Sequence, residues 1–287
     1  TDFLSIEGWH LMNRKTSKRI VHAVSYLALG IGAVIMLVPL IWAFTTSLKT
    51  TNEAFVYPPT FFGKEILWSN YLKISDRFNF LNMFKNTSIV TIASVILQLT
   101  TSAMAGFAFS YLKFRGRDRI FMLFLFSMMV PYHVLLVPTF MLLKKLNLIN
   151  TLWALILPTA VTPFGAFLMR QSFMSLPSEM GEAAKIDGCN PWGVFTKMFL
   201  PLAKPALTTL GIFTVVGSWN DFLRPLIYLT DDSLMTITLG IYNMQGAFST
   251  NWPVLMCTVM VSIIPVLIIF VCLQDLFVEG VALTGMK

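Results

Sequence analysis

Long apolar segments alternate with short polar ones along the chain. Six runs are long enough to cross roughly 30 Å of hydrocarbon as an α-helix, and they lie at 22–47, 86–111, 120–143, 151–169, 204–227 and 253–274. They are continuously apolar and lack the alternation of a barrel strand. The fifth run is the least regular, because Asp221 and Arg224 lie near its end and Pro225 would bend or stop a helix. The pattern predicts an all-α, polytopic membrane protein with six transmembrane helices.

The composition agrees with a chain that lies in the lipid bilayer. Of the 287 residues, 56% are hydrophobic and only 12% are charged, and the mean hydropathy is +0.71. A soluble domain would carry roughly twice that charged fraction. The net charge of +7 does not indicate a nucleic-acid partner, because the basic residues form short clusters beside apolar runs and not one continuous stripe.

Lysine and arginine concentrate in alternate loops. They cluster at 14–19 before the first run and at 113–119 in the second loop, and they are spread over 170–204 in the fourth. Because cytoplasmic loops carry an excess of these residues, both termini and the fourth loop are expected in the cytoplasm. No cleavable signal peptide is recognised before the first run.

These assignments divide the chain into five parts. They are a cytoplasmic segment 1–21, a first transmembrane helix 22–47, an extracytoplasmic loop 48–85, a transmembrane core 86–275 with a cytoplasmic loop 177–203, and a cytoplasmic tail 276–287.

The sequence offers little for catalysis. It contains no G-x-x-x-x-G-K-[ST] phosphate loop, no H-E-x-x-H and no G-x-S-x-G. The three histidines and three cysteines lack metal-ligand spacing. We therefore expect no catalytic residue, no metal site and no cofactor in this chain. A polytopic membrane enzyme remains an alternative, but the lack of paired carboxylates argues against it. An autonomous channel is another alternative, and it predicts flux without ATP.

A charged segment interrupts the apolar pattern between the fourth and fifth runs. Its charged residues are Glu179, Glu182, Lys185 and Asp187. Ser178 is a suitable N-cap, Ala183 and Ala184 favour a helix, and Gly188 suits the position just after its end. The segment predicts a short helix that meets water or a soluble partner, with alanines small enough to approach a groove closely. The alternative is an ordinary solvated loop helix.

The same segment resembles the signature of permease subunits of binding-protein-dependent ABC importers. The matching residues are Glu182, Ala183, Ala184, Gly188, Leu200 and Pro201. The longer form, with Asp187, Phe195, Leu202 and Pro205, resembles the carbohydrate-uptake branch, and within it the smaller permease of maltose-type transporters. Cys189 stands where that branch often has alanine.

Three further segments resemble the same branch in the same order. They are Ala105–Phe109 leading to Phe114–Arg117, Trp219–Phe222 followed by Pro225 and Leu226, and Phe277–Gly280. The resemblance therefore covers about residue 85 to the end, whereas residues 1–84 match only in general pattern.

This resemblance implies a type I ABC importer permease in a bacterial or archaeal plasma (inner) membrane. Its partners would be a second permease subunit, with which it forms a heterodimer, and an ABC ATPase dimer that uses ATP and Mg. A third partner would be a soluble sugar-binding protein, and the loop 228–252 would enter its sugar cleft. Contacts with the ATPase would come from Glu182, Ala183, Ala184, Asp187 and Gly188, with Glu279 and Gly280 of the tail as possible additional contacts. The cargo would be a sugar or an oligosaccharide. The alternative is another solute, such as an acidic or modified oligosaccharide.

The candidates for a substrate pathway are Gln98, Tyr132, His133, Asn220 and Asp221. Gln98 belongs to a polar stripe with Thr87, Thr91, Ser94 and Thr101, whose spacing of three and four residues places them on one helical face. Such a face can line a hydrated path, but hydrogen bonding between helices is favoured. Tyr132 and His133 lie between two prolines, which is also the pattern of a kinked helix. For Asp221, pairing with Arg224 is favoured over contact with substrate.

Overall fold

The computed structural model describes residues 3–76, 79–186, 188–246 and 250–285, with the side chains of 3–20, of Ser178 and of 275–285 left out. Within these ranges all regular structure is helical. The chain forms two compact units, one of Thr1–Lys73 with Asn251–Met260 and the other of Ile74–Thr250 with Val261–Lys287. The fold class predicted from the apolar runs is confirmed.

The first unit contains α1 and an extended loop. Its elements are α1 (Phe3–Ser47), η1 (Glu53–Phe55) and the greater part of η2 (Trp68–Ser75). The α1 helix is continuous through the predicted boundary at residue 21. The Asn70 side-chain amide joins η2 to the end of α1 and the start of the loop, because it donates to the carbonyl oxygens of Ser47 and Lys49, both at 2.9 Å.

The second unit holds most of the helices. They are α2 (Phe80–Ser110), α3 (Arg117–Phe126), η3 (Ser127–Met129), α4 (Tyr132–Lys145), α5 (Trp153–Ile156), η4 (Leu157–Thr159), α6 (Pro163–Met174), α7 (Ser178–Ile186), α8 (Pro191–Val194), the π-helix η5 (Phe195–Phe199), α9 (Leu200–Leu202), α10 (Lys204–Trp219), α11 (Leu223–Tyr228), η6 (Asp232–Leu234) and α12 (Ile237–Asn243). The last helix, α13 (Trp252–Gly285), starts in the first unit and continues in the second.

Three unbroken helices are long and apolar enough to cross a membrane: Val21–Ser47, Phe80–Ser110 and Trp252–Gln274. Three bent pairs pass the same criteria, Arg117–Met129 with Tyr132–Lys145 (102°), Trp153–Thr159 with Pro163–Met174 (41°) and Pro191–Leu202 with Lys204–Trp219 (76°). Counting each pair as one span gives up to six, the predicted number.

Prolines and caps explain where the helices differ from the apolar runs. The 102° bend follows from Pro131, which disfavours helical backbone at Val130, and Val130 is indeed extended. The second helix starts at Phe80 and not at 86, because the Asn79 side chain accepts a hydrogen bond from Asn82 N and caps it. The fifth run, predicted as 204–227, is not one helix, since α10 ends at Trp219 and α11 begins at Leu223.

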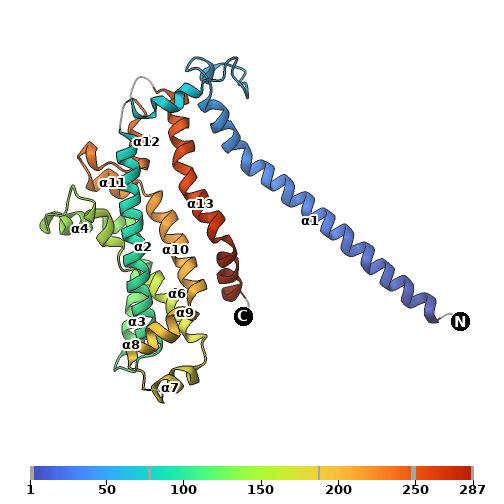
Figure 1. Ribbon diagram of the computed structural model, residues 1–287, viewed down its shortest axis with the longest axis vertical. Helices are drawn as coiled ribbons and strands as arrows, with labels where there is room; N and C mark the ends of the chain where they lie inside the picture. Colours follow the sequence, from blue (N-terminus) through green and yellow to red (C-terminus); the bar gives the residue numbers. More distant parts are fainter. Residues whose placement is uncertain (1–2, 77–78, 187, 247–249, 286–287) are drawn as a thin grey trace. The chain divides into compact units, whose positions relative to one another are not determined.

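The α2 helix is the centre of the second unit. Its 31 residues correspond to about 46 Å at 1.5 Å per residue. It packs against α6 and α10, and Gly106 permits this approach, since a Cβ there would lie 2.8 Å from the backbone nitrogen of Arg170. One end of α2 lies near α7, α8 and α9, and the other lies near α11 and α12 (Figure 1).

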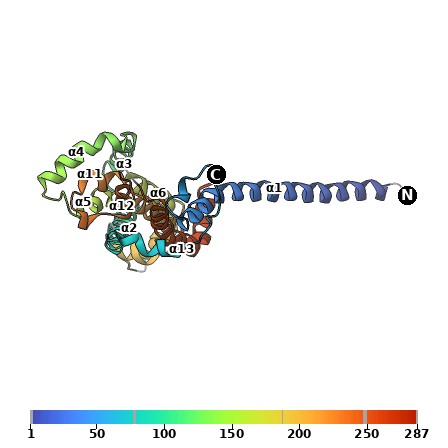
Figure 2. The ribbon, with the colours of Figure 1, turned by 90° about the horizontal axis from the view of Figure 1, so that it is seen from above.

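Separate apolar clusters hold the two ends of this unit. At one end, Phe107 of α2 packs with Phe173 of α6 and with Phe195 and Phe199 of the π-helix. Toward the other end, α4, α5 and α11 gather on one side, seen from above in Figure 2, around the fully buried Tyr228. The α2 helix thus connects two regions that are far apart, and each contains residues of the predicted site.

Candidate functional site

The predicted short helix in the fourth loop is present as α7. It is followed by Gly188, whose φ of +82° lies in the left-handed region that glycine adopts most easily. The ending resembles a Schellman turn, because Gly188 N donates to Lys185 O at 3.0 Å and Cys189 N donates to Ala184 O at 2.9 Å. Asp187, a predicted contact residue, lies outside the described residues.

The two faces of α7 differ in exposure. Glu182, Ala183 and Lys185 are exposed, and Ile186 is 87% exposed. In contrast, Ala184 is only 4% exposed and belongs to the apolar cluster around Phe107. Ala184 therefore does not face outward as predicted, because it lies one turn after the buried Gly181 and shares its inward face, whereas Ala183 is exposed and its contact with a partner stays a prediction.

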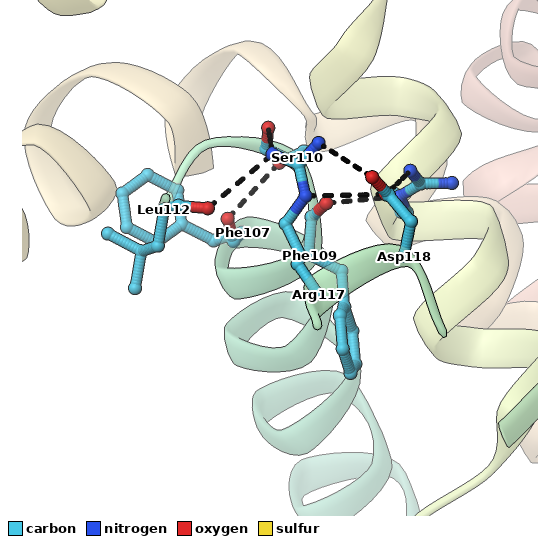
Figure 3. A network of polar contacts seen from close by, with 7 residues as sticks. Phe107, Phe109, Ser110, Leu112, Arg117 and Asp118 are labelled. Atoms are coloured by element: carbon cyan, nitrogen blue, oxygen red, sulfur yellow. Dashed lines mark hydrogen bonds and ion pairs between the residues drawn. The ribbon is translucent and has the colours of Figure 1, made fainter. Parts of the chain in front are cut away.

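A polar network joins α2, α3 and α6 near the same end of the unit. Arg170 of α6 donates through Nε to Phe109 O at 3.1 Å and through Nη2 to Asp118 Oδ1 at 2.9 Å. Arg117 also pairs with Asp118, at 3.3 Å, and donates to the carbonyl oxygens of Ser110 and Leu112 (Figure 3). The Arg170 guanidinium lies 4.2 Å from the centre of the Phe121 ring. This junction could not be predicted from a local pattern, since Arg170 and Asp118 are 52 residues apart.

Asp221 and Arg224 form a close ion pair at the other end of the unit. Arg224 Nε lies 2.6 Å from Asp221 Oδ2, and the two side chains are 13% and 16% exposed. The Arg224 guanidinium also approaches Leu155 O at 3.4 Å, and the Thr238 hydroxyl donates to Asp221 O at 2.5 Å. The structure therefore places Asp221 in the pairing that the sequence favoured over contact with a substrate.

The three other pathway candidates from this region, Tyr132, His133 and Asn220, differ in their contacts. Tyr132 lies close enough to Asp221, Arg224 and Tyr228 to interact electrostatically with all three, so the structure brings together residues predicted from separate segments. His133 is exposed beside Tyr132, with ring centres 6.1 Å apart. Asn220 is exposed, and its amide donates to Val216 O at 2.9 Å.

The polar stripe of α2 makes mostly contacts between segments. Gln98 Nε2 donates to Thr162 Oγ1 at 2.9 Å, and the Thr101 hydroxyl donates to Ala160 O at 2.5 Å. Thr87 Oγ1 accepts from Ile237 N at 2.9 Å, and Ser94 Oγ accepts from Thr159 at 3.2 Å. These contacts agree with the favoured alternative, hydrogen bonding between helices.

The remaining predicted residues lie in the tail and in the loop 228–252. Glu279 and Gly280 belong to α13, but their side chains lie outside the described residues. In the loop, Thr230 N and Asp231 N donate to the Asn150 Oδ1 atom, both at 3.0 Å, and Asn150 itself lies between α4 and α5. The hydrogen bonds from Ser233 hold the pKa of Asp231 below its usual value. Among the described residues, no group of three or more His, Cys, Asp or Glu could hold a metal ion.

Comparison with known proteins gives a consistent result. Residues 98–282 match the family described as "Binding-protein-dependent transport system inner membrane component". The arabinooligosaccharides transport system permease protein AraQ of Halalkalibacterium halodurans is 37% identical over 204 residues, which are 71% of this chain and 73% of that protein. The sulfoquinovosyl glycerol transport system permease protein SmoH of Agrobacterium fabrum is 36% identical, over 91% of this chain and 93% of its own.

A solved structure agrees with this family at the level of the fold. It is a bacterial ABC transporter involved in the import of the acidic polysaccharide alginate, with a TM-score of 0.81 and 25% identity over 91% of this chain and 98% of the matched one. The resemblance first recognised from Glu182, Gly188 and Pro201 is thereby confirmed, as is the permease fold that it implied. The chain belongs to the family of inner membrane components of binding-protein-dependent transport systems.

Proposed function

We propose that this chain is the permease subunit of an ATP-driven importer of a sugar or an oligosaccharide. The observation that carries this function is the exposed outer face of α7, with Glu182, Ala183 and Ile186, at one end of the helix bundle that matches the family. This face is free for a soluble partner, and it lies in a charged segment that interrupts the apolar runs. The chain supplies the path, and solute crosses by alternating access.

The energy for transport comes from partner subunits. An ABC ATPase dimer binds ATP and Mg, and Glu182, Ala183 and Gly188 contact it, together with Asp187. Ala184 supports this contact from the inner face of α7, because it is buried in the permease itself. The tail with Glu279 and Gly280 is a second contact.

The remaining partners follow from the same architecture. A second, different permease subunit completes the translocation path, and a soluble sugar-binding protein delivers the solute to the loop 228–252. Both termini and α7 face the cytoplasm, in agreement with the distribution of lysine and arginine.

The solute is a carbohydrate, on the basis of the relatives. The name of AraQ includes arabinooligosaccharides, and the name of SmoH includes sulfoquinovosyl glycerol. A second candidate is an acidic oligosaccharide, which the likeness to the alginate importer favours. The two cargoes differ in charge, so competition by neutral and acidic oligosaccharides in one uptake assay separates them.

The test is uptake of labelled oligosaccharide into proteoliposomes that contain the chain with the proteins that co-purify with it. We expect uptake only with ATP, and we expect Glu182→Lys and Gly188→Asp each to abolish it without loss of membrane insertion. Glu65→Lys is the matched control, because Glu65 is an exposed carboxylate of the first loop. Full uptake by both α7 variants would refute the docking role of α7, and uptake without ATP would support a channel.

A further inference from the structure

Tyr111 occupies the junction between α2 and α7. It is the C-cap of α2, and its backbone nitrogen donates to Phe107 O at 2.9 Å. Its ring stacks on Phe107, with centres 5.1 Å apart and planes inclined by 27°, and lies 5.0 Å from the Phe199 ring. These contacts fix the ring on the apolar cluster at this end of α2.

The same side chain contacts α7 at two positions one turn apart. The Tyr111 hydroxyl donates to Gly181 O at 2.9 Å, and Lys185 Nζ lies 5.0 Å from the centre of the Tyr111 ring. Gly181 is buried and has no room for a side chain, since a Cβ there would lie 2.9 Å from the Tyr111 hydroxyl oxygen. Residues at i and i+4 are neighbours on a helix, so the Tyr111 ring spans one turn of α7, from the buried Gly181 to the exposed Lys185.

These contacts tie the short helix α7 to the end of α2. The helix is only nine residues long, and helices below about 12 residues depend on tertiary packing for their stability. The inward residues Gly181 and Ala184 are small, and Tyr111 is one of the residues packed against the apolar cluster that contains Ala184.

We propose that Tyr111 is a positioning residue that fixes the orientation of α7 relative to α2. This inference rests on the proposed function, in which the opposite face of α7 docks on an ATPase. Movement of α7 is then passed through the Tyr111 ring to the end of α2, the central helix of the unit. Without the hydrogen bond from the Tyr111 hydroxyl to Gly181 O, α7 still forms but tilts on its docking partner, so that ATP hydrolysis is less well coupled to transport.

The first experiment removes only the hydroxyl. In the full chain, Tyr111→Phe keeps the ring on Phe107 and Phe199 but loses the bond to Gly181 O, and hydrogen exchange is followed in α6, α7 and α10. Loss of a neutral hydrogen bond of ordinary net strength should make exchange in α7 about 2- to 10-fold faster. Exchange in α6 and α10 should not change. Tyr57→Phe is the matched control, because Tyr57 is 92% exposed in the first loop.

The second experiment uses the close contact between Gly181 and the ring. Gly181→Ala forces a methyl group against Tyr111, so uptake should fall by at least about 10-fold. Adding Tyr111→Leu, which removes the ring, should restore part of this loss. Gly211→Ala is the control, because a Cβ at Gly211 meets Leu99 at an ordinary 3.8 Å.

Measuring both uptake and ATP hydrolysis in the assembled transporter separates positioning from a general loss of structure. We expect Tyr111→Phe to lower the amount of solute carried per ATP, whereas a loss of folded complex would lower both rates equally. Unchanged exchange in α7 would overturn the proposal, whatever happens to uptake. Faster exchange in α7 with an unchanged ratio of solute to ATP would overturn the coupling role. The separate Glu182→Lys result decides whether α7 docks at all, so failure of the proposed function is distinguishable from failure of this inference.

Discussion

Asp221, in the break between α10 and α11, lies 2.6 Å from Arg224 in the first turn of α11, and each side chain is less than one fifth exposed. Asp221 Oδ1 also accepts a hydrogen bond from the backbone nitrogen of Arg224, at 3.5 Å. Asp221 and Arg224 therefore stabilise the turn after α10, where the helix ends before the predicted end of the fifth run. The pair supports the geometry of this turn and leaves neither charge isolated in an apolar environment.

Removing one partner of this pair should lower the free energy of unfolding more than removing both partners. Asp221→Asn leaves the Arg224 charge without its carboxylate, and we expect the free energy of unfolding to fall by up to about 3 kcal/mol. The double variant Asp221→Asn with Arg224→Gln removes both charges and should recover most of that loss. Thermal unfolding in detergent tests both variants. A change of substrate preference at unchanged stability would instead show that Asp221 contacts the solute.

Two threonines of the α2 stripe offer a matched comparison. Thr87 Oγ1 donates to Met83 O and accepts from Ile237 N, both at 2.9 Å. Thr91 Oγ1 is buried without a hydrogen-bond partner among the described residues. Since Val has nearly the shape of Thr, Thr87→Val should cost about 1 to 3 kcal/mol through the unpaired Ile237 nitrogen, whereas Thr91→Val should be neutral or stabilising. Equal losses of thermal stability would contradict this assignment.

The structure shows which features a single sequence can specify. The apolar runs and the Glu182 and Gly188 signature identify the helical fold and the exposed α7, because hydropathy and cap chemistry are local properties. Pro131 similarly predicts a kink, although not its size. The inward face of Ala184 and the network of Arg170 were not predictable, because they depend on contacts with residues distant in the sequence. Tyr111 gave no signal of its own for the same reason, since its partner Gly181 lies 70 residues away.

Arg170 should contribute more to the junction of α2, α3 and α6 than its acidic partner. Asp118 is 67% exposed, so Asp118→Asn should change the free energy of unfolding by about 1 kcal/mol or less. Arg170→Met also loses the bond to Phe109 O and the stacking on Phe121, and we expect a loss of about 2 kcal/mol. Unfolding at low and high salt separates the ion pair with Asp118 from the contacts with Phe109 O and Phe121, because only the ion pair is screened by salt. A larger effect of Asp118→Asn than of Arg170→Met would contradict this ranking.

The first loop should lose order in acid through Glu53. Hydrogen bonds from the backbone nitrogens of Lys64 and Thr50 hold the pKa of Glu53 below its ordinary value of 4.5. Because the pKa is lower in the folded loop than in the unfolded one, the stabilisation is complete above the ordinary value and is lost as the pH falls through the folded one. Limited proteolysis of the loop 48–75 in mild acid should therefore accelerate as the pH falls below about 4.5. Glu53→Gln removes the titrating group and should flatten this pH dependence, whereas Glu65→Gln, an exposed carboxylate of the same loop, should leave it intact. If the Glu53 variant keeps the acid-induced cleavage, another group controls the loop.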